Sequence, residues 1–556
     1  MKKKKVLITA ALPYANGSIH FGHLAGAYLP ADCYARYSRL IGNDTLYICG
    51  SDEYGVAISL SAELAGRSPE EHAEHFHTLN KSLFEKMEIS FDHYSRTTWP
   101  RHSEATYEYF HDLLEEGYIE EQESEQLYSE KDDAFLADRY VVGTCPKCRY
   151  EKARGDECPK CGSSFEATDL LNPASKITGS PLALKKTNHW YLRLDLFREK
   201  LLQWINEKKW KPNVMNFIGG YIDELRPRAI TRDTKWGIPL PLEGVSGKVL
   251  YVWFEAPIGY ISATKEWAEK KGLPDSWKDY WLDKETKLVQ FIGKDNIPFH
   301  AVIFPAMTMG QKKPYKLVDE LVANEFYNLE GKKFSKSEGW YIDLESFLER
   351  YSPEELRYTL AANAPETQDS EFTWDDFMMR VNAELCGKFG NFIHRTCTFI
   401  YKNIEKKGVK PFTLSSEDQL FLEELRRLTD EIQKGYEECR LRHVTRLIME
   451  MAQKGNGYFD HNAPWKSMKE GDIEKVETCL YCSLECIKLL SLVSAPILPQ
   501  ATKAIWKMLQ IEEELSNLSW SEIVSFSVEK CSLQKPEVLF KKLDEKDIER
   551  EKEQFQ

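Results

Sequence analysis

Residues 5–23 read KVLITAALPYANGSIHFGH, and this stretch decides the fold of the amino-terminal part. The mostly apolar run at residues 5–10 predicts a buried strand. Asn16-Gly17 predicts a turn, and a helix is expected to begin near Gly22. A strand followed by a helix N-terminus is the usual start of a nucleotide-binding α/β layer, whose ligands lie beyond the carboxyl ends of the strands. The stretch therefore predicts a Rossmann-like parallel sheet.

Two histidines close this stretch. His20 and His23 can face one side of a first helical turn, where free N–H groups and the positive end of the helix dipole favour phosphate. Gly22 has no Cβ, so a large ligand can approach the backbone there. The alternative is that both are surface histidines on a turn, because short motifs match by chance.

A second motif lies far downstream, at residues 331–339, GKKFSKSEG. The ammonium groups of Lys333 and Lys336 could stabilise charge that develops on a leaving pyrophosphate in the transition state. The alternative is a solvated basic loop. Our hypothesis is that the fold brings the two histidines and the two lysines around one nucleotide triphosphate.

Size and composition limit the classes of function. The chain has 556 residues and a formal net charge of −14, and about three to five domains are expected for this length. Its apolar segments are short and interrupted by charges, so we expect no membrane span. The acidic balance argues against non-specific nucleic-acid binding as the main task, although a structured RNA could meet a local basic surface.

The cysteines and the first residues predict a compartment. Thirteen cysteines, four clustered and the others scattered without disulfide-like spacing, fit a reducing environment. Residues 1–15 imitate a signal peptide, but the apolar run is short and leads directly into the histidine motif. We therefore expect a cytoplasmic protein.

Changes in composition and in hydrophobic pattern divide the chain into candidate domains. We expect an α/β domain in two halves, at 1–116 and 229–320, interrupted by an inserted domain at 117–228. Further strands of the sheet are expected near residues 45–49, 248–254 and 287–292. The lysine motif lies in a region at 321–380, a helical bundle follows at 381–510, and 511–556 is an extension. Its end, residues 541–556, is nearly all charge and is expected to be a frayed helix or a disordered tail.

The inserted domain carries two C-x-x-C pairs. Cys145 and Cys148 form the first, Cys158 and Cys161 the second, with nine residues between the pairs. This spacing predicts a tetrahedral zinc site. Four thiolates leave no open coordination position, so the zinc would be structural. The alternative is four unrelated reduced thiols.

The pair of phosphate motifs, in this order, resembles the class I aminoacyl-tRNA synthetases. Three further segments look like the methionyl-tRNA synthetase family: ALPYANG at 11–17, YVWFEAPIGY at 251–260 and FIGKDNIPFH at 291–300. The resemblance runs from about residue 5 to about residue 510. Two departures are visible, since Phe21 replaces the commoner aliphatic residue and Phe334 the common methionine. Neither removes a histidine or a lysine of the motifs.

The resemblance implies roles for individual residues. The ATP-binding residues would be His20, Gly22, His23, Gly293, Asp295, Lys333 and Lys336, and His20, His23, Lys333 and Lys336 would be catalytic. Asp52 would bind the α-ammonium group of methionine. The side-chain pocket would be formed by Leu12, Tyr14, Trp253, Ala256, Pro257, Tyr260, Phe299 and His300. Aromatic rings suit a polarizable thioether, whereas core packing is the alternative for Trp253 and Tyr260.

The resemblance also implies what the other domains do. The insertion would be the connective peptide with its zinc, and the α-helical bundle would bind the anticodon. There Asn391, Arg395 and Trp465 offer an amide, a guanidinium and an indole, which suit unstacked bases. The alternative is a bundle with ordinary polar surface residues. Magnesium would accompany ATP, bound mainly through the phosphates.

The implied reaction is the ATP-dependent ligation of methionine to tRNA(Met) through methionyl-adenylate. Three rivals remain: a synthetase for cysteine, leucine or valine, a small-molecule nucleotidyltransferase, and a non-catalytic tRNA-binding relative. The aromatic pocket argues against the first, the insertion and bundle against the second, and the intact motifs against the third. The partners would be tRNA(Met), ATP and L-methionine, and since only a short extension follows the bundle we expect a monomer.

Overall fold

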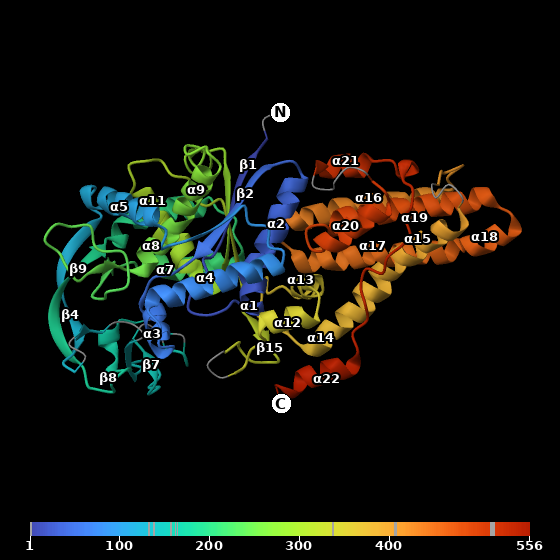
Figure 1. Ribbon diagram of the computed structural model, residues 1–556. Helices are drawn as coiled ribbons and strands as arrows, with labels where there is room; N and C mark the ends of the chain where they lie inside the picture. Colours follow the sequence, from blue (N-terminus) through green and yellow to red (C-terminus); the bar gives the residue numbers. More distant parts are fainter. Residues whose placement is uncertain are drawn as a thin grey trace.

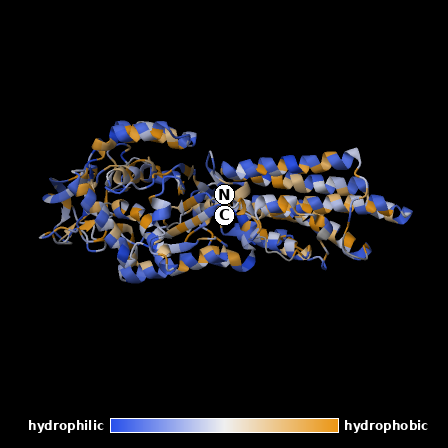
Figure 2. Cartoon of the chain, turned by 90° about the horizontal axis from the view of Figure 1, so that it is seen from above, coloured by the Kyte–Doolittle hydropathy of each residue, from blue (hydrophilic) through white to orange (hydrophobic). Residues whose placement is uncertain are grey.

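The computed structural model describes residues 3–131, 134–136, 140–155, 158–161, 163, 165–335, 339–404, 409–511 and 517–555. The molecule is elongated (Figure 1), with the α/β part and its insertion at one end and a helical bundle extending from the other side. Around the bundle helices, hydrophilic and hydrophobic residues alternate (Figure 2), as in amphipathic helices that bury one face. The expected fold class is confirmed.

The central sheet has five parallel strands in the order β14-β13-β1-β2-β3. Their bounds are Glu320–Asn324, Lys287–Gly293, Lys5–Ala10, Asp44–Ser51 and His93–Arg96. β1 lies in the middle, where Val6 is opposite Lys287 of β13 and Thr45 of β2. The strand predicted at 5–10 is confirmed. β14 crosses the boundary expected between residues 320 and 321.

β1 is buried on both faces. Val6 and Ile8 belong to one hydrophobic core, together with residues of α2 (Leu29–Leu40), whereas Leu7 belongs to a second core with α9 (Gly259–Lys270). Successive side chains of a strand point to opposite faces. A parallel strand covered by helices on both sides is therefore apolar at nearly every buried position, which explains the sequence of β1, where Thr9 is the one buried polar residue.

The insertion lies at the end of the molecule opposite the bundle (Figure 1). Its long antiparallel pair consists of β4 (Ile119–Ser129) and β9 (Ala183–Leu192). A small sheet of β7 (Ala153–Arg154), β6 (Val141–Thr144) and β8 (Leu171–Ser175) carries the cysteine pairs. Short strands β5 (Ala134–Phe135) and β10 (Arg228–Ala229) extend the β4–β9 sheet on either side.

The prediction that residues 248–254 form a strand of the central sheet is wrong. Only Val249–Leu250 is extended, as β12, and it pairs with β11 (Thr231–Arg232) in a separate two-stranded sheet. Residues from Val252 onward begin α8 (Val252–Glu255), which buries Phe254 and Glu255. Aromatic and β-branched residues favour strands only where a half-buried sheet surface exists, and here the chain packs as a helix instead.

The other helices cover the sheet or form the bundle. In the α/β part these are α3 (Val56–Leu64), α4 (Pro69–Lys86), α5 (Pro100–Glu115), α6 (Arg198–Asn206), α7 (Pro212–Asp223), α10 (Lys278–Trp281) and α11 (Phe304–Met309). The linking region has β15 (Tyr327–Leu329), β16 (Ser370–Phe372), α12 (Leu344–Arg350), α13 (Pro353–Ala362) and α14 (Trp374–Met379). The bundle contains α15 (Asn391–Asn403), α16 (Ser416–Glu437), α17 (Leu441–Asn462), α18 (Pro464–Glu470), α19 (Ile473–Ser494), α20 (Pro499–Met508) and α21 (Trp520–Ser525).

Across the described part of the chain, we find no helix with the length and apolar character needed to cross a bilayer.

The expected frayed or disordered tail at 541–556 is also wrong. Residues Glu545–Glu553 form α22, which buries Ile548 and Glu551 and packs beside α14. The highly charged composition of residues 541–556 led to the wrong prediction, because α22 contributes a single apolar side chain to the core and docks through ion pairs instead.

A buried arginine joins the sheet to the bundle. Arg357 of α13 donates from Nη2 to Asp32 Oδ2 of α2 (2.7 Å) and from Nη1 to the carbonyl of Met87 (3.1 Å). It also donates to the carbonyls of Pro496 (2.8 Å) and Ile497 (2.9 Å), between α19 and α20. One guanidinium thus holds three segments that are remote in sequence.

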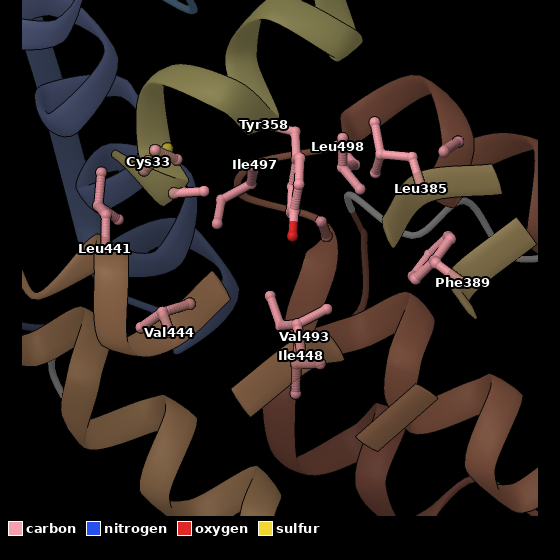
Figure 3. Close-up of a cluster of buried hydrophobic side chains, with 14 of the residues drawn as sticks. Cys33, Tyr358, Leu385, Phe389, Leu441, Val444, Ile448, Val493, Ile497 and Leu498 are labelled. Atoms are coloured by element: carbon pink, nitrogen blue, oxygen red, sulfur yellow. The ribbon is translucent and has the colours of Figure 1, made fainter. Parts of the chain in front are cut away.

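Apolar side chains surround this ion pair. Figure 3 shows Tyr358 of α13 and Ile497 between side chains of α2 and α17, among them Cys33 and Val444. Burial by itself would raise the pKa of the Asp32 carboxyl, but its arginine neighbours and its hydrogen bonds outweigh burial and lower the pKa to about 2. Asp32 is therefore ionised at neutral pH and compensates the buried cation.

We expect Asp32→Asn to lower the free energy of unfolding by about 3–5 kcal/mol at neutral pH, because Arg357 would remain as an uncompensated buried charge. Chemical denaturation measures the loss. The matched control is Glu431→Gln, at an exposed pair with Arg427 on α16, where about 1 kcal/mol or less is expected. Equal losses in the two variants would contradict the role of the buried pair.

Candidate active site

A cavity of about 450 Å³ opens at the carboxyl ends of β1, β2, β13 and β14. Its wall includes every residue that the sequence assigned to ATP or methionine except Lys336, which lies outside the described residues. These residues are Leu12, Tyr14, His20, Gly22, His23, Asp52, Trp253, Ala256, Pro257, Tyr260, Gly293, Asp295, Phe299, His300 and Lys333. The fold therefore gathers five separate stretches of the sequence around one space.

The two histidines lie at the start of α1 (Phe21–His23), which continues through a π-helical turn (Leu24–Tyr28) into α2. His20 Nδ1 accepts from the N–H of Gly22, and His23 Nδ1 accepts from the N–H of His20, both at 3.1 Å. The ring centroids are 3.8 Å apart. Because each Nδ1 accepts a hydrogen bond, the proton of each neutral ring lies on Nε2, where it can be donated to a phosphate oxygen.

Gly22 is required by its protein neighbours. A Cβ at this position would lie 2.9 Å from Cε1 of His20 and 3.2 Å from the carbonyl oxygen of Tyr327 in β15. Close approach of a ligand is the reason for a glycine that the sequence analysis expects. The structure adds a second reason, since the missing side chain leaves room for the capping ring of His20.

The lysine loop contacts the histidine motif directly. The ring of Phe334 stacks on His20 with centroids 4.7 Å apart and an interplanar angle of 5°. Lys333 lines the cavity, and its Nζ lies 4.7 Å from the centroid of Phe326. Phe334, one of the two aromatic departures from the family pattern, thus joins the two motifs.

One end of the cavity is an aromatic hollow. Trp253 and Phe299 stack with centroids 3.9 Å apart and planes 14° from parallel, and Tyr14 lies 6.3 Å from Trp253. Ala256 and Pro257 complete an apolar wall. Flat, polarizable surfaces of this kind favour a thioether.

The polar group in this hollow is uncharged. The hydroxyl of Tyr260 is 2.7 Å from His300 Nε2, and His300 Nδ1 is 3.0 Å from the carbonyl oxygen of Asn296. A carbonyl can only accept, so Nδ1 carries the proton and Nε2 accepts from the tyrosine. Burial lowers the pKa of His300 to about 4. The ring is therefore neutral at physiological pH and suits a neutral side chain.

Asp52 is a buried carboxylate in the cavity wall. Its N–H donates to the carbonyl of Pro13 (2.9 Å), and its carbonyl accepts from the N–H of Ala15 (2.8 Å), which fixes its backbone directly after β2. Burial, and then the nearby Glu255, raise the pKa of Asp52. Its Oδ1 has no hydrogen-bond partner among the described residues. A cationic group of a ligand would satisfy this oxygen.

Sequence reasoning missed a buried layer behind Asp52. Glu255 Oε2 is 2.7 Å from His102 Nε2, and His102 Nδ1 is 2.8 Å from the hydroxyl of Ser262. Glu255 lies within a segment that the sequence singled out, but His102 belongs to α5, where no local pattern marks it. Sequence reasoning also missed Asn328. This residue lines the cavity, and its buried Oδ1 has no partner in the part of the chain described.

The four cysteines of the insertion form one cluster. Their sulfur atoms all lie within 4.8 Å of one another, with 3.9 Å between Cys145 and Cys161 and 3.5 Å between Cys148 and Cys158. A tetrahedron with metal–sulfur bonds of about 2.3 Å has sulfur–sulfur edges of about 3.8 Å. The spacing fits a four-thiolate metal site and is far too long for disulfides.

The three residues expected to meet an anticodon lie on the helical bundle. Arg395 of α15 pairs with Asp460 at 2.6 Å, and its guanidinium carbon lies 5.9 Å from the ring centroid of Trp465 on α18. Trp465 is 36% exposed. Asn391, one turn before Arg395, donates to Asn456 at 3.4 Å. A guanidinium and an accessible indole therefore lie together on one surface.

Two family models match this chain. The one described as "tRNA synthetases class I (M)" matches residues 6–397, and the one described as "Anticodon binding domain of methionyl tRNA ligase" matches residues 411–556. Together they include the cavity, the cysteine cluster and most of the bundle.

Curated relatives match over almost the whole chain. The methionine–tRNA ligase of Protochlamydia amoebophila (strain UWE25) is 56% identical over 553 residues, covering 99% of this chain and 79% of the relative. That of Chlamydia caviae is 52% identical over 549 residues, covering 97% of this chain and 100% of the relative. These identities extend through the α/β part, the insertion and the bundle.

Solved structures share the fold. A methionyl-tRNA synthetase of Mycobacterium tuberculosis in complex with methionyl-adenylate has a TM-score of 0.80 and 24% identity, covering 97% of this chain and 99% of that one. Its apo form has a TM-score of 0.75 and 22% identity, covering 98% and 99%. The family models and the curated relatives, together with this fold, show that the chain belongs to the methionyl-tRNA synthetase family of the class I aminoacyl-tRNA synthetases, the methionine–tRNA ligases.

Proposed function

We propose that this chain activates L-methionine with ATP and transfers it to the 3′-terminal adenosine of tRNA(Met). In the first step a methionine carboxylate oxygen attacks the α-phosphorus, the bond to pyrophosphate breaks, and methionyl-adenylate forms. In the second step a ribose hydroxyl attacks the adenylate carbonyl and AMP leaves. The observation that carries the proposal is the single cavity that joins the histidine motif, Lys333 and the aromatic hollow.

The phosphates of ATP would lie against the imidazoles and the lysine loop. His20 and His23 would donate from Nε2, Lys333 and Lys336 would stabilise the charge that develops on pyrophosphate, and Gly293 and Asp295 would meet the adenosine. Catalysis of this kind needs no covalent intermediate, because positioning and electrostatic stabilisation lower the barrier. Magnesium would enter with ATP and be bound chiefly by phosphate oxygens.

Methionine would be held at both of its ends. The unpartnered Oδ1 of Asp52 would accept from the α-ammonium group, a charge-assisted hydrogen bond. The thioether would lie against Trp253 and Phe299, where sulfur–aromatic contacts contribute about 0.3–1.5 kcal/mol each. The neutral Tyr260–His300 pair adds a polar wall without a charge to be neutralised. Valine would leave this hollow partly empty.

The tRNA would contact two other regions. The cysteine cluster would hold one structural zinc through Cys145, Cys148, Cys158 and Cys161, and the metal would fix the shape of the connective peptide near the acceptor end. Asn391, Arg395 and Trp465 would meet the CAU anticodon.

All thirteen cysteines are free thiols, which supports the proposed cytoplasmic location.

An amino-acid panel in ATP–pyrophosphate exchange tests the substrate. Methionine should be activated well above valine, leucine and cysteine, and Trp253→Ala should raise the KM for methionine about tenfold or more through lost ring contacts. The KM for ATP should change little. The control is Trp267→Ala, a partly buried tryptophan of α9 outside the cavity wall. Equal activation of valine would refute the assignment.

Lys333→Ala should slow adenylate formation about a hundredfold, because the lost ammonium group acts on charge that develops in the transition state. The Kd for methionine should not change. Rapid-quench measurement of adenylate and equilibrium binding of methionine separate the two effects. Lys278→Ala serves as the control, because it removes an exposed lysine that, among the described residues, pairs with Asp275 alone. A wild-type adenylate burst in Lys333→Ala would exclude the role.

Trp465→Ala should weaken aminoacylation of tRNA about tenfold or more, because base–aromatic stacking contributes about 1–3 kcal/mol per base. ATP–pyrophosphate exchange without tRNA should stay at the wild-type rate, since the bundle surface is not part of the cavity. Comparison of the two assays on one preparation gives the result. A similar loss in both would argue for a folding defect and against anticodon recognition.

A further inference from the structure

The chain beyond the bundle returns to the catalytic part. After α21, Phe540 packs against Phe389 with ring centroids 6.3 Å apart. Asn382 and Leu543 exchange two hydrogen bonds, from Asn382 Nδ2 to the Leu543 carbonyl (3.1 Å) and from the Leu543 N–H to Asn382 Oδ1 (2.7 Å). Figure 1 shows α22 below α14, close to β15 and away from the rest of the bundle.

α22 is docked by a buried carboxylate. Glu551 is 7% exposed, and its Oε1 lies 2.8 Å from Arg350 Nε and 3.3 Å from the hydroxyl of Tyr351. One turn earlier, Ile548 enters the large core that also contains Phe21 of the histidine motif. The helix therefore has a fixed position on α12 and α14.

Directly after α22, Phe555 contacts the lysine loop. Its ring lies edge-on to the indole of Trp340, with centroids 5.2 Å apart and planes at 75°. Trp340 closes the loop, because its backbone exchanges two hydrogen bonds of 2.9 Å with Ser335 and its Nε1 donates to the carbonyl of Leu329 (2.8 Å). The Nζ of Lys332 lies 4.0 Å from the indole centroid. The indole of Trp340 thus contacts the residues just before Lys333, and the backbone of Trp340 is bonded to Ser335, just after it.

The loop is held between two aromatic contacts. On the cavity side, Phe334 stacks on His20. On the outer side, Trp340 rests on Phe555. Lys333 lies between Lys332, which contacts the indole of Trp340, and Phe334, which stacks on His20, so its direction into the cavity depends on the path of the backbone that these contacts fix. A shift of about 1 Å in a group that acts on a transition state can cost about a hundredfold in rate.

We propose that Phe555 and Trp340 are positioning residues for methionine activation: the ring contact between them fixes the loop that carries Lys333 over the cavity. The proposal rests on the proposed function, because it assigns the residues that aim one of its catalytic groups. The segment after the bundle is then a part of the activation machinery, although it lies at the opposite end of the sequence from the histidine motif.

The test is a double-mutant cycle of Phe555→Ala and Lys333→Ala, with the rate of adenylate formation as the readout. Phe555→Ala alone should lower this rate about tenfold, with the Kd for methionine and the melting temperature unchanged. In the Lys333→Ala background the same substitution should have almost no effect, because Phe555 acts through Lys333. Phe555→Tyr, which keeps the ring, should restore the wild-type rate.

The control is Glu549→Ala, on the exposed face of α22, which should leave the rate unchanged. The proposal is overturned if Phe555→Ala retains the wild-type rate, if its effect is equally large without Lys333, or if rate, methionine binding and melting temperature fall together. Wild-type protein that forms no methionyl-adenylate, or Lys333→Ala that forms it normally, would instead refute the proposed function itself.

Discussion

The pairing of β1 with β13 is the constraint on which the whole site depends. Residues 6–10 align with 287–291, although the complete insertion lies between them in the sequence. Parallel strands end at the same edge of a sheet, so the segments that follow both strands must meet there. The histidine motif comes from one of these segments and Phe299 and His300 from the other.

Arg357 imposes a second constraint, on the relation between the sheet and the bundle. A buried ion pair contributes little net stability, because desolvation offsets the attraction, but separating its partners is strongly unfavourable. Here the guanidinium also satisfies three backbone carbonyls, one at Met87 and two in the segment between α19 and α20. An altered angle between bundle and sheet would break several of these bonds at once. The distance between the cavity and the surface that carries Trp465 is thereby fixed, which suits a protein that would contact one tRNA at both places.

The cavity separates charge recognition from shape recognition. At one side, Asp52 has a buried oxygen with no partner among the described residues and attracts a cation. In the aromatic hollow, Tyr260 and His300 satisfy each other and carry no charge. A zwitterionic amino acid with a neutral, polarizable side chain matches this division. The loop that brings Lys333 to the cavity wall is held by the stacking of Phe334 on His20.

The strand at 5–10, the parallel sheet, the four-cysteine cluster and the motif residues of the cavity wall could be predicted without a structure, because each follows from a local pattern or from a motif that the family resemblance carries. It failed at 248–254 and at α22, where propensity and composition were overruled by what packs nearby. Only the tertiary structure revealed His102 behind Asp52, the stacking of Phe334 on His20 and the contact of Phe555 with Trp340. The physical reason is that such contacts join segments far apart in the chain, and neither periodicity nor spacing records which distant side chain will occupy the space beside them.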